Sequence, residues 1–272
     1  MDLDAYFERI GSDGTREPDL ATLTEIILHH AAAIPFEAID VLLGKGIDTA
    51  PDAIFDKLVR RKRGGYCFEQ NGLLLHVLTA LGFAATTRLA RVLWMRAADA
   101  PPPNATHMAL IISIGGRDYL ADTGFGNGTP TIPLAFDTTG PQPTPLETFR
   151  LRASLDGHVL EMRVGESWSP VYEMLAAVPD AGQLADANLF TSTHPESRFR
   201  KDLMLARATV DRRYLLLGNR MTVRPSGNEA KLSIYRTPDE LRRAVETVFL
   251  LPTEPDWQPV FERFTSPEMQ PV

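Results

Sequence analysis

The spacing of the apolar residues changes at Gly82, and this change limits the folds that the chain can adopt. Before Gly82, apolar side chains return every three or four positions, as in 20–27 and 54–59, which is the spacing of amphipathic helices. After Gly82 they form short runs such as 86–95 and 107–114, separated by Gly, Pro and Asp. The sequence therefore predicts a bundle of helices followed by an antiparallel β-structure.

Dipeptides that favour tight turns divide the middle of the chain. Gly115-Gly116 separates two apolar runs, and Asp156-Gly157 separates two more, so that both predict β-hairpins. The proline run 101–103 and the proline-rich stretch 141–145 are expected in surface loops, because proline donates no hydrogen bond to a sheet. We expect this region to be a small antiparallel barrel or sandwich.

The last third of the chain combines strand-like runs with one clear helix. The runs lie near 203–205, 214–217 and 232–234. Thr237-Pro238 supplies an N-cap hydroxyl and a proline at the first helical position, and Glu240 completes a capping box, which predicts a helix to about residue 250. The 272 residues are 44% hydrophobic, which suits one large domain or two to three subdomains that share a core.

Charge and hydropathy argue against several partners. The formal net charge is −7 and the sequence pI is near 5.4, which disfavour nucleic acid and anionic lipid. No apolar run approaches the roughly 20 residues that cross a bilayer. The acidic start, residues 1–4, lacks the basic and apolar regions of a leader, so we expect a soluble, cytoplasmic protein.

Cys67 is the only cysteine, so no intramolecular disulfide and no cysteine-rich zinc site can form. A lone cysteine is usually a small, buried apolar residue. Cys67, however, follows Gly64-Gly65 and opens a predicted helix over 67–81. The unpaired N–H groups and the dipole at a helix start favour a thiolate and are able to hold an oxyanion, which indicates a nucleophile.

His107 is the best candidate for the base that a thiolate needs. His107 begins an apolar strand and Asp122 ends the strand that returns from the Gly115 turn, so cross-strand pairing predicts that they are neighbours. A carboxylate beside an imidazole fixes its tautomer and stabilises the imidazolium. Such a pair can also be a purely structural hydrogen bond, but the helix-opening cysteine favours a triad. The other histidines are expected to be solvated, capping, loop or structural residues: His29, His30, His76, His158 and His194.

A glycine-rich segment, 124–128, follows Asp122 and contains one aromatic residue, Phe125. Such a segment alone more often marks a turn. Beyond a catalytic aspartate, its N–H groups would be able to approach a pyrophosphate or an acyl group. The segment lacks the Lys and the Ser or Thr of a phosphate-binding loop, and it does not follow the dinucleotide layout.

Several segments resemble motifs of the arylamine N-acetyltransferase family. Residues 63–71, Arg-Gly-Gly-Tyr-Cys-Phe-Glu-Gln-Asn, are similar to that family's nucleophile signature. Residues 106–108 are similar to its histidine segment, and 122–126 to its aspartate segment, where the second position is more often valine. The stretch 6–11, the turn 34–37 and the stretch 192–199 also look like family segments, so the likeness covers nearly the whole chain in order.

The resemblance implies an α+β fold of three parts with a cysteine-protease-like catalytic core. These parts are an N-terminal helical bundle with the nucleophile (1–83), a central antiparallel β-barrel with the histidine and aspartate (84–200), and a C-terminal α/β lid (201–272). The triad Cys67, His107 and Asp122 would lie where the bundle meets the barrel.

The resemblance also implies an acetyl-CoA-dependent transferase of xenobiotic metabolism. By a ping-pong mechanism, acetyl would pass through a thioester on Cys67 to the nitrogen of an arylamine or arylhydrazine, or to the oxygen of an arylhydroxylamine. The implied contacts are Phe36, Phe125 and Phe199 for the acceptor, and Trp94, Gly124, Gly126 and Gly128 for CoA. No metal is expected, and a homodimer stays open.

Three alternatives use the same residues differently. A thiol hydrolase would release the acyl group to water, although peptidases do not share the residues that flank Cys67. A macrolactam-forming amide synthase of the same fold would keep the triad but accept a carrier-bound polyketide. A thiol sensor without catalytic activity would oxidise at Cys67 and show no thioester chemistry.

Overall fold

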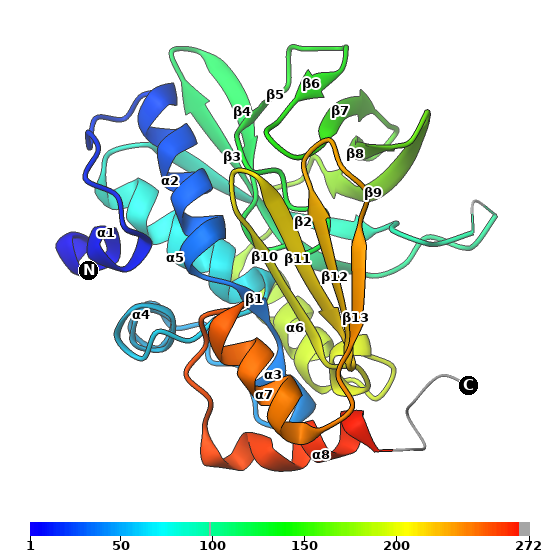
Figure 1. The fold of residues 1–272 in the computed structure, drawn as a ribbon. Coiled ribbons are helices and arrows are strands. Elements are labelled where there is room, and N and C mark those ends of the chain that lie inside the picture. The colour runs from blue at the N-terminus through cyan, green and yellow to red at the C-terminus, as the bar shows by residue number, and fades with distance from the viewer. Residues whose placement is uncertain (98, 267–272) are drawn as a thin grey trace.

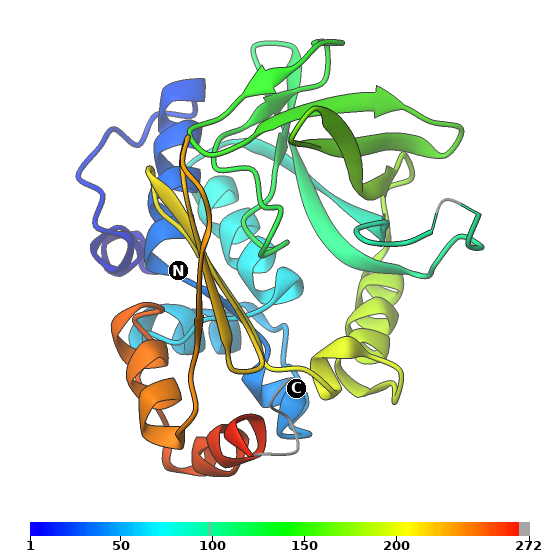
Figure 2. The same ribbon diagram turned by 45° about the vertical axis from the view of Figure 1, so that its right-hand side comes forward.

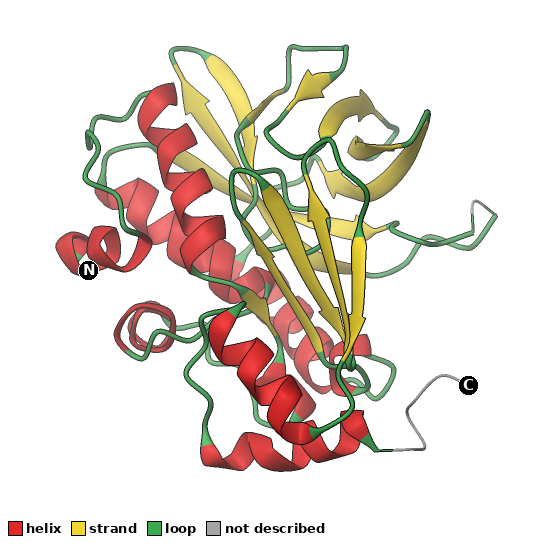
Figure 3. Ribbon diagram, in the orientation of Figure 1, coloured by secondary structure: helices red, strands yellow, loops and turns green. Residues whose placement is uncertain are grey.

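The computed structural model describes residues 1–97 and 99–266, and it confirms the predicted α+β fold. Helices form the N-terminal third, a curled antiparallel sheet the middle, and a second antiparallel sheet with two helices the C-terminal third (Figure 1; Figure 3). None of the helices in the described ranges has the length and apolar character needed to cross a membrane. The last six residues of the predicted lid, 267–272, lie outside the described residues.

The N-terminal helices pack around α5. They are α1 (Leu3–Ile10), α2 (Leu20–Ala33), α3 (Ile39–Leu42), α4 (Pro51–Phe55), which runs into a π-helical turn (Asp56–Arg60), and α5 (Cys67–Ala80). Leu73, Leu74, Val77 and Leu78 of α5 are fully buried. The helix packs against α4 on one side and against the middle sheet on the other, so it joins two parts of the core.

The middle sheet is antiparallel and almost closes on itself. Its strands are β2 (Ala84–Val92), β3 (Ala105–Ile114), β4 (Arg117–Ala121), β5 (Leu134–Ala135), β6 (Gln142–Pro143), β7 (Thr148–Ala153), β8 (Gly157–Val164) and β9 (Ser167–Leu175). Their order is β5-β4-β3-β2-β9-β8-β7-β6. The hairpins predicted at Gly115-Gly116 and Asp156-Gly157 are confirmed as β3–β4 and β7–β8. The side-chain amide of Gln142 in β6 bonds the N–H and C=O of Ala135 in β5, which brings the two edges together.

The second sheet takes one strand from the N-terminal part. Its order is β1 (Phe36–Glu37), β10 (Met204–Ala208), β11 (Arg212–Leu217), β12 (Arg220–Pro225) and β13 (Lys231–Ile234), and α7 (Pro238–Thr247) and α8 (Gln258–Thr265) cover one face (Figure 2). The turn expected at 34–37 is wrong, because Phe36 and Glu37 pair with β10. The capping box predicted at Thr237 is confirmed and begins α7.

Helix α6 (Ala181–Thr193) and strand β6 were not predicted from the sequence. The helix lies in the stretch predicted as barrel. Its buried residues, Ala187, Thr191 and Ser192, are small or polar, so the helix has no apolar stripe. The capping box of Asp180 and Gln183 was the local signal that could have revealed it. Pro143 lies in β6, a strand at the edge of the sheet where proline is tolerated, rather than in a loop.

Arg63, just before α5, connects the N-terminal and C-terminal parts through buried charges. The side chain is 1% exposed, and its Nη2 lies 2.7 Å from Glu37 Oε1 and 3.2 Å from Asp40 Oδ2. Its Nη1 lies 3.1 Å from Glu254 Oε1, and the guanidinium carbon is 4.5 Å from the ring centre of Trp257. A planar fork of five donors suits such an arrangement better than an ammonium group.

We expect Arg63→Met to lower the free energy of unfolding by about 3–5 kcal/mol, because it leaves the Glu37 carboxylate buried without a cation. Urea denaturation at neutral pH measures this change. The matched control is Arg60→Met. The Arg60 side chain is 65% exposed and makes only a long ion pair, 3.9 Å, with Asp56, so its loss should cost less than about 1 kcal/mol. Equal losses in the two variants would contradict a structural role for the buried charges.

Candidate active site

The glycine pair before Cys67 lets the chain run close beside β1. Glu37 N–H donates to Gly65 O at 3.1 Å, and Phe36 forms a parallel bridge with Gly65. A Cβ on Gly64 would lie 2.2 Å from the carbonyl oxygen of Pro35, so no larger residue fits there without a backbone shift. This close approach sets the point at which α5 begins.

Cys67 is the first residue of α5, as predicted. The Glu69 carboxylate accepts the N–H of Tyr66 at 3.0 Å, and the N–H groups of Glu69 and Gln70 donate to Tyr66 O. The N–H groups of Cys67 and Phe68 come before these first helical hydrogen bonds, at the positive end of the helix dipole. The Cys67 sulfur therefore lies at the end of α5 that favours negative charge.

His107 and Asp122 are neighbours, as predicted, although the predicted register is wrong. His107 Nε2 lies 2.8 Å from Asp122 Oδ2, and both side chains are buried. The strands pair Leu110 with Ala121, so a direct pairing of 107 with 122 is off by two residues, and Asp122 lies just past the end of β4. The two side chains meet diagonally, which is still within reach for a ring and a carboxylate.

Asn71 holds Asp122 in place, a role that was not predicted from the sequence. Its Nδ2 donates to Asp122 Oδ1 at 2.9 Å, and its Oδ1 accepts the N–H of Thr123 at 2.9 Å. Gly124 N–H also donates to Asp122 Oδ1, at 2.8 Å. Asn71 stands one helical turn after Cys67, and this spacing of four was a signal that it shares a face of α5 with the cysteine.

The charges of the site favour an imidazolium beside a carboxylate. Burial by itself disfavours a charged His107, but the charge and hydrogen bond of Asp122 and the contact with Cys67 outweigh it and raise the pKa of His107 to about 10. Burial opposes ionisation of Asp122 too, but His107 and the donors around it keep the pKa of that carboxyl below its usual value. Because Nε2 faces Asp122, Nδ1 is the nitrogen available to the Cys67 sulfur.

Two aromatic rings fix the plane of the imidazole. The ring centre of Phe125 lies 5.1 Å from that of His107 in an edge-on arrangement, and that of Tyr172 lies 4.8 Å away. Tyr172 is fully buried on β9 and reaches the site because it pairs with Val92 of β2. No local sequence signal marks Tyr172, since its position depends on pairing between strands 80 residues apart.

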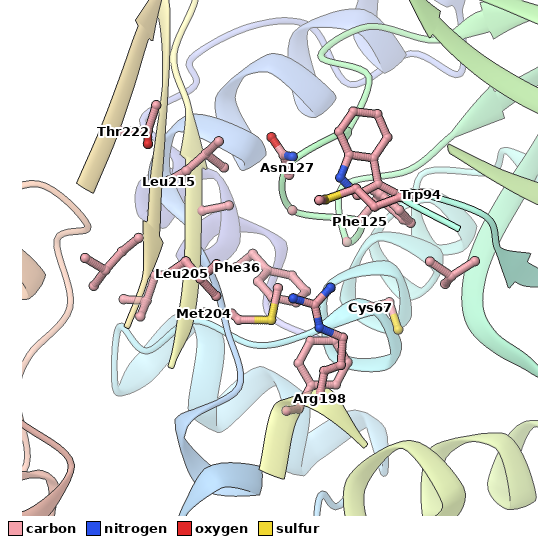
Figure 4. A pocket seen from close by; sticks show the side chains of 18 of the residues that line it. Phe36, Cys67, Trp94, Phe125, Asn127, Arg198, Met204, Leu205, Leu215 and Thr222 are labelled. Atoms are coloured by element: carbon pink, nitrogen blue, oxygen red, sulfur yellow. The ribbon is translucent and has the colours of Figure 1, made fainter. Parts of the chain in front are cut away.

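A cavity of about 410 Å³ opens onto Cys67 and His107. Figure 4 shows Trp94, Phe125 and Asn127 on one side of it and Met204, Leu205 and Leu215 of the C-terminal sheet on the other. Most of the residues that the sequence analysis assigned to substrates line this cavity: Phe36, Phe125, Phe199, Trp94, Gly124 and Gly126. Gly128 does not line the cavity, because it is buried within its loop with Val171 and the ring of Phe125 packed against it.

His30 is a structural histidine, but the expectation that it is solvated or caps a helix is wrong. The side chain is fully buried between Tyr6, whose hydroxyl lies 2.9 Å from Nδ1, and Gln70, whose Oε1 lies 2.7 Å from Nε2. Burial lowers the pKa of His30 to about 4, so the ring is neutral at neutral pH. Among the described residues, no group of three His, Cys, Asp or Glu side chains is placed to hold a metal ion.

Over most of its length the chain is similar to N-acetyltransferases. Residues 19–257 match the family model described as N-acetyltransferase, so the chain is an acyltransferase. An arylamine N-acetyltransferase of Mycolicibacterium smegmatis is 44% identical over 230 residues, which cover 84% of this chain and 84% of that relative. The structure of the M. tuberculosis arylamine N-acetyltransferase matches with a TM-score of 0.92 and 37% identity, covering 97% of this chain and 100% of that one. The structure of the Mycobacterium marinum arylamine N-acetyltransferase in complex with CoA matches with a TM-score of 0.91 and 34% identity, covering 97% and 98%.

The chain belongs to the arylamine N-acetyltransferase family. The family, the enzyme class and the fold that the motifs predicted are therefore confirmed. The roles of the individual site residues and the boundaries of the three predicted parts stay predictions.

We expect His107 to remain protonated at neutral pH and to titrate near pH 10. An NMR titration of the histidine-labelled protein would measure this midpoint. Because this pKa lies above the ordinary value of 6.5, protonated His107 stabilises the folded state. This contribution to the free energy of unfolding is complete below about pH 6.5 and is lost as the pH rises through about 10. Asp122→Asn should lower this midpoint, because it removes the negative charge that offsets the effect of burial on the pKa of His107. A midpoint near 6.5 in the unaltered protein would contradict the arrangement.

Gly124→Ala should disturb the site directly. A Cβ at this position would lie 2.7 Å from the Cα of Cys67, which is backbone and cannot move without shifting α5. We expect the rate of Cys67 alkylation to change and the free energy of unfolding to fall by about 1–3 kcal/mol. Gly140→Ala is the control, because no atom lies within 4 Å of its Cβ, and it should leave both quantities unchanged.

Proposed function

We propose that this enzyme transfers an acetyl group from acetyl-CoA to the nitrogen of an aromatic amine or hydrazine through a thioester on Cys67. The observation that carries the proposal is a thiol at the first residue of α5, in contact with an imidazole whose other nitrogen is 2.8 Å from a buried carboxylate, on the wall of an apolar cavity. A nucleophile, a base and a group that orients the base are the parts of a covalent acyl-transfer site.

In the first half-reaction, the Cys67 thiolate attacks the carbonyl carbon of acetyl-CoA. A bond forms between Sγ and the acetyl carbon, and the bond from that carbon to the CoA sulfur breaks. The CoA sulfur takes the proton of the His107 imidazolium and leaves as the thiol. The N–H groups at the start of α5 stand where an oxyanion on the acetyl oxygen would form. Exchange between two thioesters is nearly isoenergetic, so a stable thiolate and this oxyanion site are the main requirements.

In the second half-reaction, the acceptor nitrogen attacks the acetyl carbon on Cys67. His107, now neutral, removes the proton from the nitrogen, which matters because an aryl amine is a weak base. The Cys67 thiolate then leaves, and the imidazolium and thiolate are restored. The oxygen of an arylhydroxylamine would react in the same way and give O-acetylation.

The cavity walls suit both substrates. The rings of Phe36 and Phe199 lie 5.8 Å apart near the thiol, and together with Phe125 they offer an apolar slot for an aryl ring. Trp94 and the loop residue Gly126 line the cavity beside this slot, and we assign CoA to that side. The homologue from Mycobacterium marinum, which was solved in complex with CoA, supports the choice of donor. Gly128, which does not line the cavity, would act only by shaping the loop.

The proposal predicts that acetyl-CoA without acceptor adds the mass of one acetyl group to the protein, and that this mass lies on Cys67. Intact-mass analysis followed by peptide mapping measures this addition. Cys67→Ala should show no added mass and no CoA release, whereas normal turnover in that variant would end the proposal. The acetyl group should leave faster with an aromatic amine than with water, and equal rates would favour the hydrolase instead.

A further inference from the structure

The loop 124–129 forms part of the cavity wall but has little structure of its own. It belongs to no helix or strand. Within the described residues, its one internal backbone hydrogen bond runs from Thr129 N–H to Gly126 O and is long, at 3.4 Å. At its first residue, Gly124 N–H is held by Asp122. The rest of the loop therefore depends on side chains from elsewhere in the chain.

Arg213 of β11 provides these contacts. Its guanidinium is 1% exposed and donates from Nη1 to Gly126 O at 3.0 Å and from Nη2 to Thr129 O at 2.8 Å. The same group forms a bidentate pair with Glu147, from Nε at 2.9 Å and from Nη2 at 2.8 Å. One buried cation thus joins the C-terminal sheet, the loop and the segment before β7.

A second arginine adds to this contact. Arg224 of β12 stands opposite Arg213 in the sheet, and its Nη2 donates to the side chain of Asn127. Asn127 lines the cavity between the two loop carbonyls that Arg213 holds. The loop from 126 to 129 is therefore fixed from the C-terminal sheet, whereas Cys67, His107 and Asp122 are held by α5 and the barrel.

We propose that Arg213 is a positioning residue for the acyl donor, and that it holds the loop 126–129 in the shape that admits and binds the CoA part of acetyl-CoA. This inference rests on the proposed function. Within the described part of the chain, the hydrogen bonds of the Arg213 guanidinium go to Glu147 and to the loop carbonyls of Gly126 and Thr129, and not to the triad. Its loss should therefore leave the acylation chemistry intact and weaken only the contacts of a large donor. Lysine is a poor replacement, because an ammonium group cannot make all four of these hydrogen bonds in one plane.

The test compares a large and a small acyl donor. Arg213→Met alone leaves Glu147 buried without its cation, so the double variant Glu147→Gln/Arg213→Met, which removes both charges, keeps the test independent of misfolding. In both variants we expect kcat/KM for acetyl-CoA to fall by about tenfold or more, mainly through KM. The rate at which p-nitrophenyl acetate acetylates Cys67 should stay within about twofold. For Arg213→Lys, kcat/KM for acetyl-CoA should lie between the value of these two variants and that of the unaltered protein.

The neighbouring arginine on the same strand is the matched control. The Arg212 side chain is 43% exposed and pairs with Asp211 at 2.5 Å, so Arg212→Met should leave KM for acetyl-CoA unchanged. Equal losses with acetyl-CoA and p-nitrophenyl acetate in the double variant would overturn the proposal, because they would mean a general structural role. An unchanged KM in the double variant would overturn it too. Failure of the proposed function is distinguishable, since the unaltered protein would then form no acetyl-Cys67 with acetyl-CoA.

Discussion

The amide side chain of Asn71 is the contact on which the geometry of the site depends. It comes from α5, the helix that begins at Cys67, and binds Asp122 and Thr123, which belong to the barrel. Because Cys67 lies one turn earlier on the same helix, the amide fixes the distance between the sulfur and the His107–Asp122 pair. All of these groups are buried, so the hydrogen bonds are strong and costly to leave unmade. Two parts of the fold thus meet in one arrangement rather than in several.

Buried arginines connect the C-terminal part to the other two. Arg63 joins the start of α5 to Glu254, and Arg213 joins β11 to the glycine-rich loop and to Glu147. Both guanidinium groups are 1% exposed, and each is matched by carboxylates, which burial of a cation requires. Residues of β10, β11 and β12 line the cavity, and Arg213 ties β11 to the loop that lines it too, so the C-terminal sheet is held in place where it forms the cavity wall.

The surroundings of the imidazole explain how one histidine could serve both half-reactions. The rings of Phe125 and Tyr172 exclude water around His107, and a low dielectric strengthens its attraction to Asp122. The same contact holds the pKa of His107 well above its ordinary value. In the proposed mechanism, the imidazolium would keep its proton while Cys67 is a thiolate and would give it to a leaving group of higher basicity. The apolar walls next to the thiol give an aryl acceptor a place to bind without competing for those charges.

The sequence by itself determined the local features of this protein. The glycine pair before Cys67 predicted the helix start, the Gly115-Gly116 turn predicted that His107 and Asp122 meet, and the motifs around them predicted the family. These features depend on backbone conformation within a few residues, which local sequence encodes. The tertiary structure alone decided the diagonal register of the pair and the parts played by Tyr172 and Arg213. Such side chains come from strands distant in the chain, and only the packing of two sheets against one helix brings them to the same place.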